Sequence, residues 1–255
     1  MKNCIHYGDA LQIIRELPSN SFDLVYLSLP KSVPLYKDYF ENYHSEKYIG
    51  FAEGEYQGEL REYLIGLVPI IIEAKDKLNE SGIIYVHGDY RRNHYVKGLL
   101  LDKVFSRKMF LNEIVWIAED EFSNEGIWPS KHETILMYGK SLDYKFYTDN
   151  VDRIDYMAPS LVSKTKREKK KFPTDTWWYT QISDYEMYKR LVFSVTNTKD
   201  TILDIFPKNE LLAKVCSNEQ RKFTLIEKSK IRAKVLWDVF GTENDVEWIG
   251  KNPTQ

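Results

Sequence analysis

The sequence predicts an α/β fold built on a doubly wound, mostly parallel sheet. Short apolar runs of strand length, such as Asp23–Leu27 and Asp200–Phe206, alternate along the chain with longer segments of helical apolar spacing. These runs are apolar at most positions, which is typical of strands buried on both faces of a parallel sheet. A chain of 255 residues with 43% hydrophobic residues is large enough for one α/β domain with an inserted module.

The first predicted elements are a strand, a helix and a second strand. Cys4–Tyr7 has the length and composition of a short strand, and a Gly-Asp turn follows it. Asp9 is expected to cap the helix Ala10–Leu17, whose apolar residues share one face. A Pro-Ser-Asn turn ends this helix, and the buried strand Asp23–Leu27 comes next.

The middle of the chain continues the alternation. Residues 31–57 are polar and rich in tyrosine, and a loop of that length in a compact domain is usually functional or mobile. Pro69 predicts a kink in the helix that follows. The elements expected here are the helix Glu59–Leu78, the strand Ile83–His87, the helix Asp89–Phe105, and the strands Leu111–Ile117 and Glu133–Tyr138.

The last third begins with residues 142–180, which show no clear periodicity. This stretch contains a run of basic residues and the pair Trp177-Trp178. Beyond it the alternation resumes, and the tail from Gly241 is expected to be peripheral. The elements expected here are the helix Asp184–Thr196, the strand Asp200–Phe206, the helix Lys208–Ser217, the strand Phe223–Glu227 and the helix Ser229–Phe240.

Composition excludes several function classes. The net charge of −2 means that any nucleic-acid contact must come from a local basic patch. The two cysteines, far apart in sequence, suggest neither a disulfide framework nor a zinc site, and His87, His94 and His132 lack metal-ligand spacing, so no metal is expected. The longest apolar run is too short to span a bilayer, and no signal segment is visible, so we expect a soluble, cytoplasmic protein without membrane contact.

Three stretches carry a resemblance to a known family. They are GDALQIIRELPSNSFDLVYLSLPK near the start, NEIVW in the middle and KHETILMYGKS after it. In this order they resemble the beta-type amino-group DNA methyltransferases, which methylate adenine N6 or cytosine N4. The resemblance covers roughly residues 3–240 and implies a seven-stranded, Rossmann-like methyltransferase sheet. It divides the domain 1–240 into a catalytic half (1–141), a recognition insertion (142–183) and a cofactor half (184–240), followed by the tail 241–255.

The catalytic tetrapeptide of that family departs from its usual form here. The family has Asp-Pro-Pro-Tyr or Ser-Pro-Pro-Tyr, whereas this chain has Ser28, Leu29, Pro30 and Lys31. In the family this motif orients the target amino group, and its aromatic residue stacks on a flipped base. Leu29 removes a proline that stiffens the loop, and Lys31 removes the aromatic face. Tyr36 or Tyr39 are alternative sources of an aromatic ring.

The positions of the cofactor pocket are also only partly kept. The family pattern Asp-x-Phe-x-Gly-x-Gly, over which S-adenosylmethionine binds, corresponds here to a segment with two matching and two altered positions. Asp204 and Phe206 match, but Lys208 and Glu210 replace the two glycines that let the cofactor approach the backbone. Glu210 is expected to add an unfavourable charge near the methionine carboxylate. Glu227 matches the acid that binds the ribose, and Asp9 the residue near the adenine.

The basic run lies inside the recognition insertion. Its cations are Lys164, Lys166, Arg167, Lys169, Lys170 and Lys171, offset by Glu168. Such a run is commonly only a solvated loop, but its place before two tryptophans favours contacts with the phosphates of double-stranded DNA.

These patterns lead to three hypotheses. The preferred one is a degenerate methyltransferase homologue that no longer binds S-adenosylmethionine tightly. It would act as a DNA-binding or scaffolding subunit, as a homodimer or a heterodimer with an active methyltransferase. The His-Pro-x-x-Lys-Pro segment of the family is also missing, so three parts of one site are altered. The alternatives are an active N4-cytosine or N6-adenine methyltransferase that binds S-adenosylmethionine through unusual motifs, and a protein-interaction module that does not bind DNA.

Overall fold

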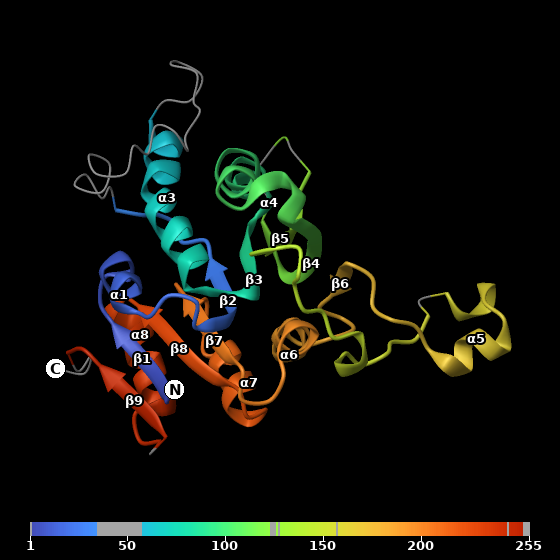
Figure 1. Ribbon diagram of the computed structural model, residues 1–255. Coiled ribbons are helices and arrows are strands. Elements are labelled where there is room, and N and C mark those ends of the chain that lie inside the picture. Colours follow the sequence, from blue (N-terminus) through green and yellow to red (C-terminus); the bar gives the residue numbers. More distant parts are fainter. Residues whose placement is uncertain are drawn as a thin grey trace.

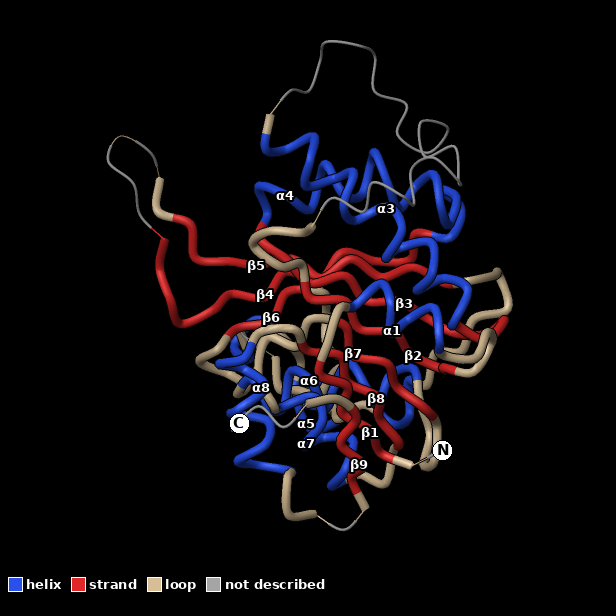
Figure 2. The backbone as a smooth tube through the Cα atoms, turned by 90° about the vertical axis from the view of Figure 1, so that its left-hand side faces the viewer, coloured by secondary structure: helices blue, strands red, loops and turns tan. Residues whose placement is uncertain are grey.

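The fold is a twisted sheet with helices on both faces (Figures 1 and 2). The computed structural model describes residues 2–34, 58–122, 126, 128–156, 158–243 and 245–251. Nine strands form one sheet in these ranges, in the order β6-β4-β5-β3-β2-β7-β8-β1-β9. The fold class predicted from sequence is therefore confirmed, and the sheet has two strands more than the seven expected.

The chain supplies its strands and helices in alternation, as predicted. The strands are β1 (Asn3–Tyr7), β2 (Phe22–Ser28), β3 (Leu78–Asp89), β4 (Phe110–Phe122), β5 (Ser130–Gly139), β6 (Thr176–Trp178), β7 (Thr201–Ile205), β8 (Lys222–Glu227) and β9 (Val246–Ile249). The α-helices are α1 (Ala10–Glu16), α3 (Glu59–Lys77), α4 (Tyr90–Tyr95), α5 (Lys164–Lys169), α6 (Asp184–Val195), α7 (Leu211–Asn218) and α8 (Lys230–Phe240).

The sheet is mostly parallel, with β5 as the antiparallel member between β3 and β4. The strand β2 pairs in parallel with β3 on one side and with β7 on the other. From β2 the chain winds outward through β3, and from β7 it winds outward in the opposite direction through β8. The switch point of the winding is therefore between β2 and β7, and ligands of open α/β sheets bind in the crevice outside the carboxyl ends at such a point.

Burial on both faces explains the continuous apolar runs of the central strands. Val25 and Leu27 of β2 pack in the layer formed with α1, α3 and the helix after α4. Leu24 and Tyr26 of the same strand pack in the opposite layer, with α6, α7 and α8. This alternation requires apolar side chains at successive positions, which is the pattern by which parallel strands are recognised in sequence.

The structure adds detail to four of the sequence expectations. The tail, expected to be peripheral, contributes β9, which pairs in parallel with β1 at the sheet edge. The stretch without periodicity contains β6, which pairs with β4, and the short helix α5. The helix expected at Asp89–Phe105 consists of α4 followed by a π-helix, Val96–Ser106. The helix α3 continues through Pro69.

Within the described ranges, no helix combines the length and the apolar composition needed to cross a membrane.

Candidate functional site

A cavity of about 500 Å³ lies at the carboxyl ends of the central strands. It is formed by the segments that follow β2, β3 and β7, together with the start of β5, so it lies at the switch point of the sheet. We call it the strand-end cavity. Its described lining comprises Ser28, Leu29, Pro30, Lys31, His87, Gly88, Asp89, Tyr90, Arg91, Arg92, Ser130, His132, Glu133, Phe206, Lys208 and Arg232.

The altered tetrapeptide forms one wall of this cavity. The backbone N–H of Leu29 donates to the carbonyl of His87 at 2.8 Å. The guanidinium of Arg92 donates to the carbonyls of Pro30 and Lys31 at 3.2 and 3.0 Å. Neighbouring residues thus fix the backbone that the missing proline would stiffen. Tyr36 and Tyr39, the alternative aromatic residues, lie outside the described residues.

Ser28 is the buried polar member of the tetrapeptide. The residue is 7% exposed, and its hydroxyl has no hydrogen-bond partner among the described residues. Buried hydroxyls are normally paired, so this one remains available to a group that enters the cavity. Lys31, by contrast, is exposed at the cavity mouth.

A chain of polar contacts crosses the floor of the cavity. The ammonium of Lys208 contacts both carboxylate oxygens of Glu133, at 2.7 and 2.6 Å. The other partner of Glu133 is His87, with 2.9 Å between Nε2 and Oε2. The second ring nitrogen of His87 lies 2.5 Å from the hydroxyl of the fully buried Tyr26. Four residues from β2, β3, β5 and the segment after β7 therefore form one connected network.

The charge state of Glu133 follows from these contacts. Burial alone would raise its pKa, but the hydrogen bond and charge of His87 and the ammonium of Lys208 lower the pKa to about 2. The carboxylate is therefore ionised at neutral pH. It forms an ion pair with Lys208 that joins the segment after β7 to β5, although β2 and β3 lie between these strands in the sheet.

The two acids expected at the rim of the cofactor pocket are also paired within the chain. Glu227, 1% exposed, accepts from the guanidinium of Arg232 at 2.8 Å and from the backbone N–H of Ser229. Asp9 caps α1 by accepting from a backbone N–H and lies 3.2 Å from the ammonium of Lys228. Arg232 itself lines the strand-end cavity.

The remaining positions of the altered cofactor segment have different surroundings. Asp204 is 3% exposed, and one of its oxygens has no partner among the described residues. Burial, with a smaller contribution from Glu227, raises the pKa of Asp204 well above its usual value. Phe206 lines the cavity with a positive φ of 57°. Glu210 is the N-cap residue of α7 and forms an ion pair with Lys214 at 3.0 Å, and it is not part of the cavity wall.

The basic run lies far from the strand-end cavity. Figure 1 shows α5 at the outer end of an extension that leads away from the sheet. Every residue of α5 is exposed. Lys170 lies 3.7 Å from a carboxylate oxygen of Asp155, and the ammonium of Lys171 lies 5.6 Å from the ring centre of Tyr156. The structure therefore does not bring the expected DNA-binding residues together with the tetrapeptide.

Three residues of this cavity, His87, Glu133 and Arg232, were not among the site residues expected from sequence. The sequence patterns place Glu133 and His87 only in strands, and Arg232 only in a helix. Glu133 lies in the Lys-His-Glu motif that carries part of the family resemblance, and this motif could have marked it as a site residue. The motif does not predict its partner Lys208, which is 75 positions away in sequence. In the part of the chain that the structure describes, no group of histidine, cysteine and carboxylate side chains could hold a metal ion.

Known proteins resemble this chain over most of its length. The model of a DNA methylase family, N6_N4_Mtase, matches residues 23–236. The type II methyltransferase M.BglII of Bacillus subtilis is 25% identical over 269 aligned residues, covering 95% of this chain and 70% of the relative. The DNA adenine methyltransferase YhdJ of Escherichia coli K12 is 25% identical over 254, covering 89% of this chain and 78% of the relative.

Solved structures share the fold at lower sequence identity. The cytosine-N4-specific PvuII DNA methyltransferase superposes with a TM-score of 0.63 at 15% identity, covering 95% of this chain and 88% of the other. TTHA0409 of Thermus thermophilus, solved in complex with S-adenosyl-L-methionine, gives 0.62 at 17% identity, covering 97% and 100%. The fold, the switch-point cavity and the family match agree, and the chain belongs to the N6-adenine and N4-cytosine DNA methylase family.

Proposed function

We propose that this chain does not transfer methyl groups by itself and acts as a DNA-binding or scaffolding subunit. It would pair with an active methyltransferase, as a heterodimer, or with a second copy of itself. The observation that carries this proposal is the ion pair between Lys208 and Glu133, at 2.6 and 2.7 Å, on the floor of the strand-end cavity. Lys208 stands where the family has a glycine whose missing side chain leaves room for S-adenosylmethionine.

The charges of the cavity support the same conclusion. Its described lining has five cationic side chains and two carboxylates, and Glu227, outside the lining, neutralises one of the five cations, Arg232. S-adenosylmethionine carries a sulfonium and an ammonium group against one carboxylate, so its net charge has the same sign as the cavity wall. Like charges in a partly desolvated site repel more strongly than in water. The acid Glu227, expected to bind the ribose, already binds Arg232. The residues present therefore do not fit this cofactor well.

Isothermal titration calorimetry of the isolated chain with S-adenosylmethionine tests the proposal. We expect no measurable isotherm at sub-millimolar cofactor. A methyl-transfer assay with radiolabelled S-adenosylmethionine and duplex DNA should likewise give no incorporation. Binding together with incorporation into DNA would contradict the proposal and establish the alternative, an active N4-cytosine or N6-adenine methyltransferase.

One observation favours that active alternative. The hydroxyl of Ser28, buried and without a partner among the described residues, stands at the position of serine in the cytosine-N4 branch of the family. A hydroxyl in this state can accept a hydrogen bond from an entering amino group. If the enzyme is active, Ser28→Ala should abolish incorporation while leaving cofactor binding intact.

The DNA-binding part of the proposal depends on the basic run. Its cations lie in the short exposed helix α5 or directly after it, and α5 lies at the end of an extension that leads away from the sheet. A positively charged projection on a protein with net charge −2 supports local contact with phosphates. Absence of duplex binding at any salt concentration would instead favour a protein-interaction module that binds neither DNA nor cofactor.

The assembly part can be tested separately. We expect a dimer at tens of micromolar in sedimentation velocity, or an active methyltransferase among the proteins recovered when this chain is purified from its native cell. Monomeric behaviour combined with recovery of no methyltransferase would contradict this part of the proposal.

A further inference from the structure

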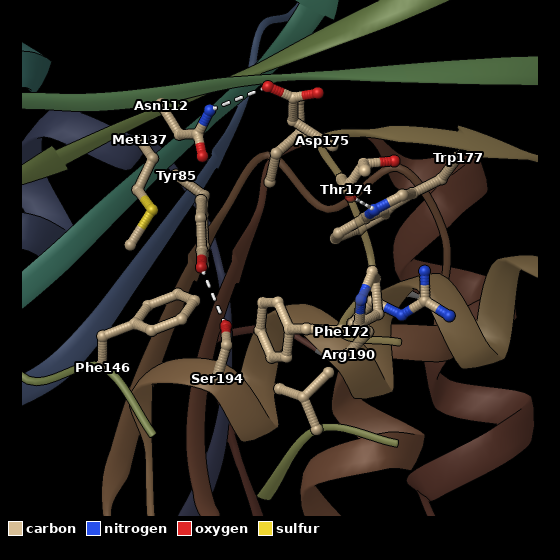
Figure 3. Close-up of a pocket in the computed structure, with 13 residues that line it drawn as sticks. Tyr85, Asn112, Met137, Phe146, Phe172, Thr174, Asp175, Trp177, Arg190 and Ser194 are labelled. Carbon is tan, nitrogen blue, oxygen red and sulfur yellow. Dashed lines mark hydrogen bonds between the residues drawn. The ribbon is translucent and has the colours of Figure 1, made fainter. Parts of the chain in front are cut away.

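A second cavity, of about 320 Å³, is lined by residues of the core layer that contains α6, on the opposite face of the sheet from α3. Figure 3 shows the residues that line it. We call it the α6 cavity, because α6 forms its floor. Strands β3, β4 and β5 supply one wall, and the segments before α5 and before β6 supply the others. Its described lining is Tyr85, Asn112, Ile114, Met137, Phe146, Val151, Phe172, Pro173, Thr174, Asp175, Trp177, Arg190 and Ser194. It shares no residue with the strand-end cavity.

The walls of the α6 cavity are largely apolar and aromatic. Phe146, Phe172 and Trp177 belong to its lining, and the rings of Phe146 and Phe172 pack edge to face with 6.2 Å between their centres. Rings of this kind offer flat faces on which a planar group stacks. Small-molecule sites in proteins are typically concave and apolar with a few polar groups that fix orientation, and the volume of this cavity lies at the lower end of their range.

Among the described lining residues of the α6 cavity, Arg190 is the one cation and Asp175 the one carboxylate. The guanidinium lies 4.9 Å from the ring centre of Trp177, and no carboxylate of the described residues forms an ion pair with it. Burial lowers the pKa of Arg190, with the more distant charges of Glu186 and Asp152 acting in the opposite direction. The carboxylate of Glu186 is bound to Ser183 in the capping box of α6. A guanidinium without an ion-pair partner can bind an entering anion through charge-assisted hydrogen bonds.

The other polar groups of the cavity leave hydrogen-bond acceptors free. Ser194 donates to the carbonyl of Leu191 at 2.8 Å, so the hydroxyl of Tyr85, at 3.1 Å, is the donor toward Ser194 and keeps its own lone pairs. One carboxylate oxygen of Asp175 accepts from the amide of Asn112 at 3.3 Å. A ligand could therefore place a donor at these oxygens and an anion at Arg190.

We propose that the α6 cavity binds a small molecule with a flat ring and one anionic group, the ring between the aromatic walls and the anion on Arg190. Two sources carry this chemistry: an aromatic carboxylate and a nucleoside monophosphate. The inference does not depend on the strand-end cavity or on methyl transfer, because it uses only residues of the other face of the sheet.

Calorimetry with two pairs of probes tests this site. Indole-3-acetate and deoxycytidine 5′-monophosphate carry the anion, and indole-3-acetamide and deoxycytidine are their neutral counterparts. We expect one anionic probe to bind and its neutral counterpart to bind about tenfold more weakly or not at all. The probe that binds identifies the source. In NMR the indole N–H of Trp177, assigned with Trp177→Phe, should shift on binding.

Arg190→Gln and Lys189→Gln form the matched pair of variants. Both remove one cation from α6, but Lys189 pairs with Glu219 outside the cavity at 2.8 Å. Arg190→Gln should weaken the anionic probe about tenfold, and Lys189→Gln should leave its affinity unchanged. The proposal is overturned if neither anionic probe binds at millimolar concentration, if the neutral probes bind equally well, or if the two variants behave alike.

Discussion

The two cavities of this molecule differ in how their cations are used. In the strand-end cavity, Lys208 is bound to Glu133 and Arg232 to Glu227, so the chain itself supplies the counter-ions. In the α6 cavity, Arg190 has an aromatic ring beside it and no carboxylate of the described residues in an ion pair. A cation that already has a carboxylate partner attracts a further anion less than a cation without an ion pair does.

The two cavities also differ in where they lie in the fold. The strand-end cavity stands at the switch point where the sheet topology places a ligand site, and the ion pair of Lys208 with Glu133 is part of its lining. The α6 cavity has no such topological reason to exist, and its space remains open. Fold position alone therefore does not identify which cavity is occupied.

The largest expected effect comes from removing the carboxylate at the centre of the strand-end network. Glu133→Gln leaves Lys208 and His87 without their anion and should lower the free energy of unfolding by about 3 kcal/mol at pH 7. The pKa of Glu133 in the folded chain is about 2, below its ordinary value of 4.5. Because the folded-state pKa is the lower one, this stabilisation is present above pH 4.5 and is lost as the pH falls toward 2.

Urea unfolding of wild type and Glu133→Gln at several pH values measures this effect. The difference in the free energy of unfolding between the two proteins should have its full value of about 3 kcal/mol at pH 7. It should decrease steadily from pH 4.5 down to the pH at which the chain no longer folds. A difference under about 0.5 kcal/mol at pH 7 would mean that the ion pair contributes no more than an exposed one.

A smaller effect is expected on DNA binding at the basic projection. Lys170 and Lys171 contact Asp155 and Tyr156, so substituting them would also disturb local structure. The variant that avoids these two contacts is the triple substitution Lys164→Glu, Lys166→Glu and Arg167→Glu. It should weaken duplex binding at least about tenfold on every sequence. It should also make the slope of log affinity against log salt shallower by about 0.9 for each phosphate that the variant no longer neutralises.

Fluorescence anisotropy over a salt series provides the measurement. The control is Lys230→Glu with Lys234→Glu, two exposed positions on α8. The control should keep the affinity and slope of wild type apart from a weak general charge effect. If the triple variant and the control weaken binding equally, the basic run is only a solvated segment.

The smallest effect concerns the hydrogen bond between Tyr85 and Ser194 inside the α6 cavity. Tyr85→Phe removes the hydroxyl that donates to Ser194 and should lower the free energy of unfolding by about 1 kcal/mol. Tyr144→Phe, at a residue that is 40% exposed, should change it by less than about 0.5 kcal/mol. Thermal or urea unfolding of the two variants separates them, and equal values would show that the buried hydrogen bond adds nothing.

The central sheet could be predicted from sequence because its strands are buried on both faces. The run at Asp23–Leu27 identified β2 to within one residue at each end. The edge strands β6 and β9 could not be predicted, since they are three and four residues long with only partial burial. Their pairing with β4 and β1 is a tertiary contact that no local pattern encodes.

The candidate site could be predicted only in part. The tetrapeptide and Phe206 lie on the strand-end cavity because strand ends follow from strand positions. Strand positions do not, however, predict which partner each side chain contacts. Lys208 and Glu210 are two residues apart and both replace glycines of the family's cofactor segment, yet Lys208 binds Glu133 across the sheet and Glu210 binds Lys214 on its own helix. Long-range ion pairs of this kind depend on packing.

Because Lys208 lines the strand-end cavity and Glu210 does not, these two residues form a matched pair of variants. The pair tests whether the side chain of Lys208 excludes S-adenosylmethionine. Wild type, Lys208→Gly and Glu210→Gly are titrated with S-adenosylmethionine in the calorimeter. We expect no isotherm for wild type or Glu210→Gly, and a measurable one for Lys208→Gly, in which the cavity floor is opened and the glycine of the family restored. A clear isotherm for wild type, or no isotherm for Lys208→Gly with its fold intact, would contradict the proposal that the side chain of Lys208 excludes S-adenosylmethionine from this cavity.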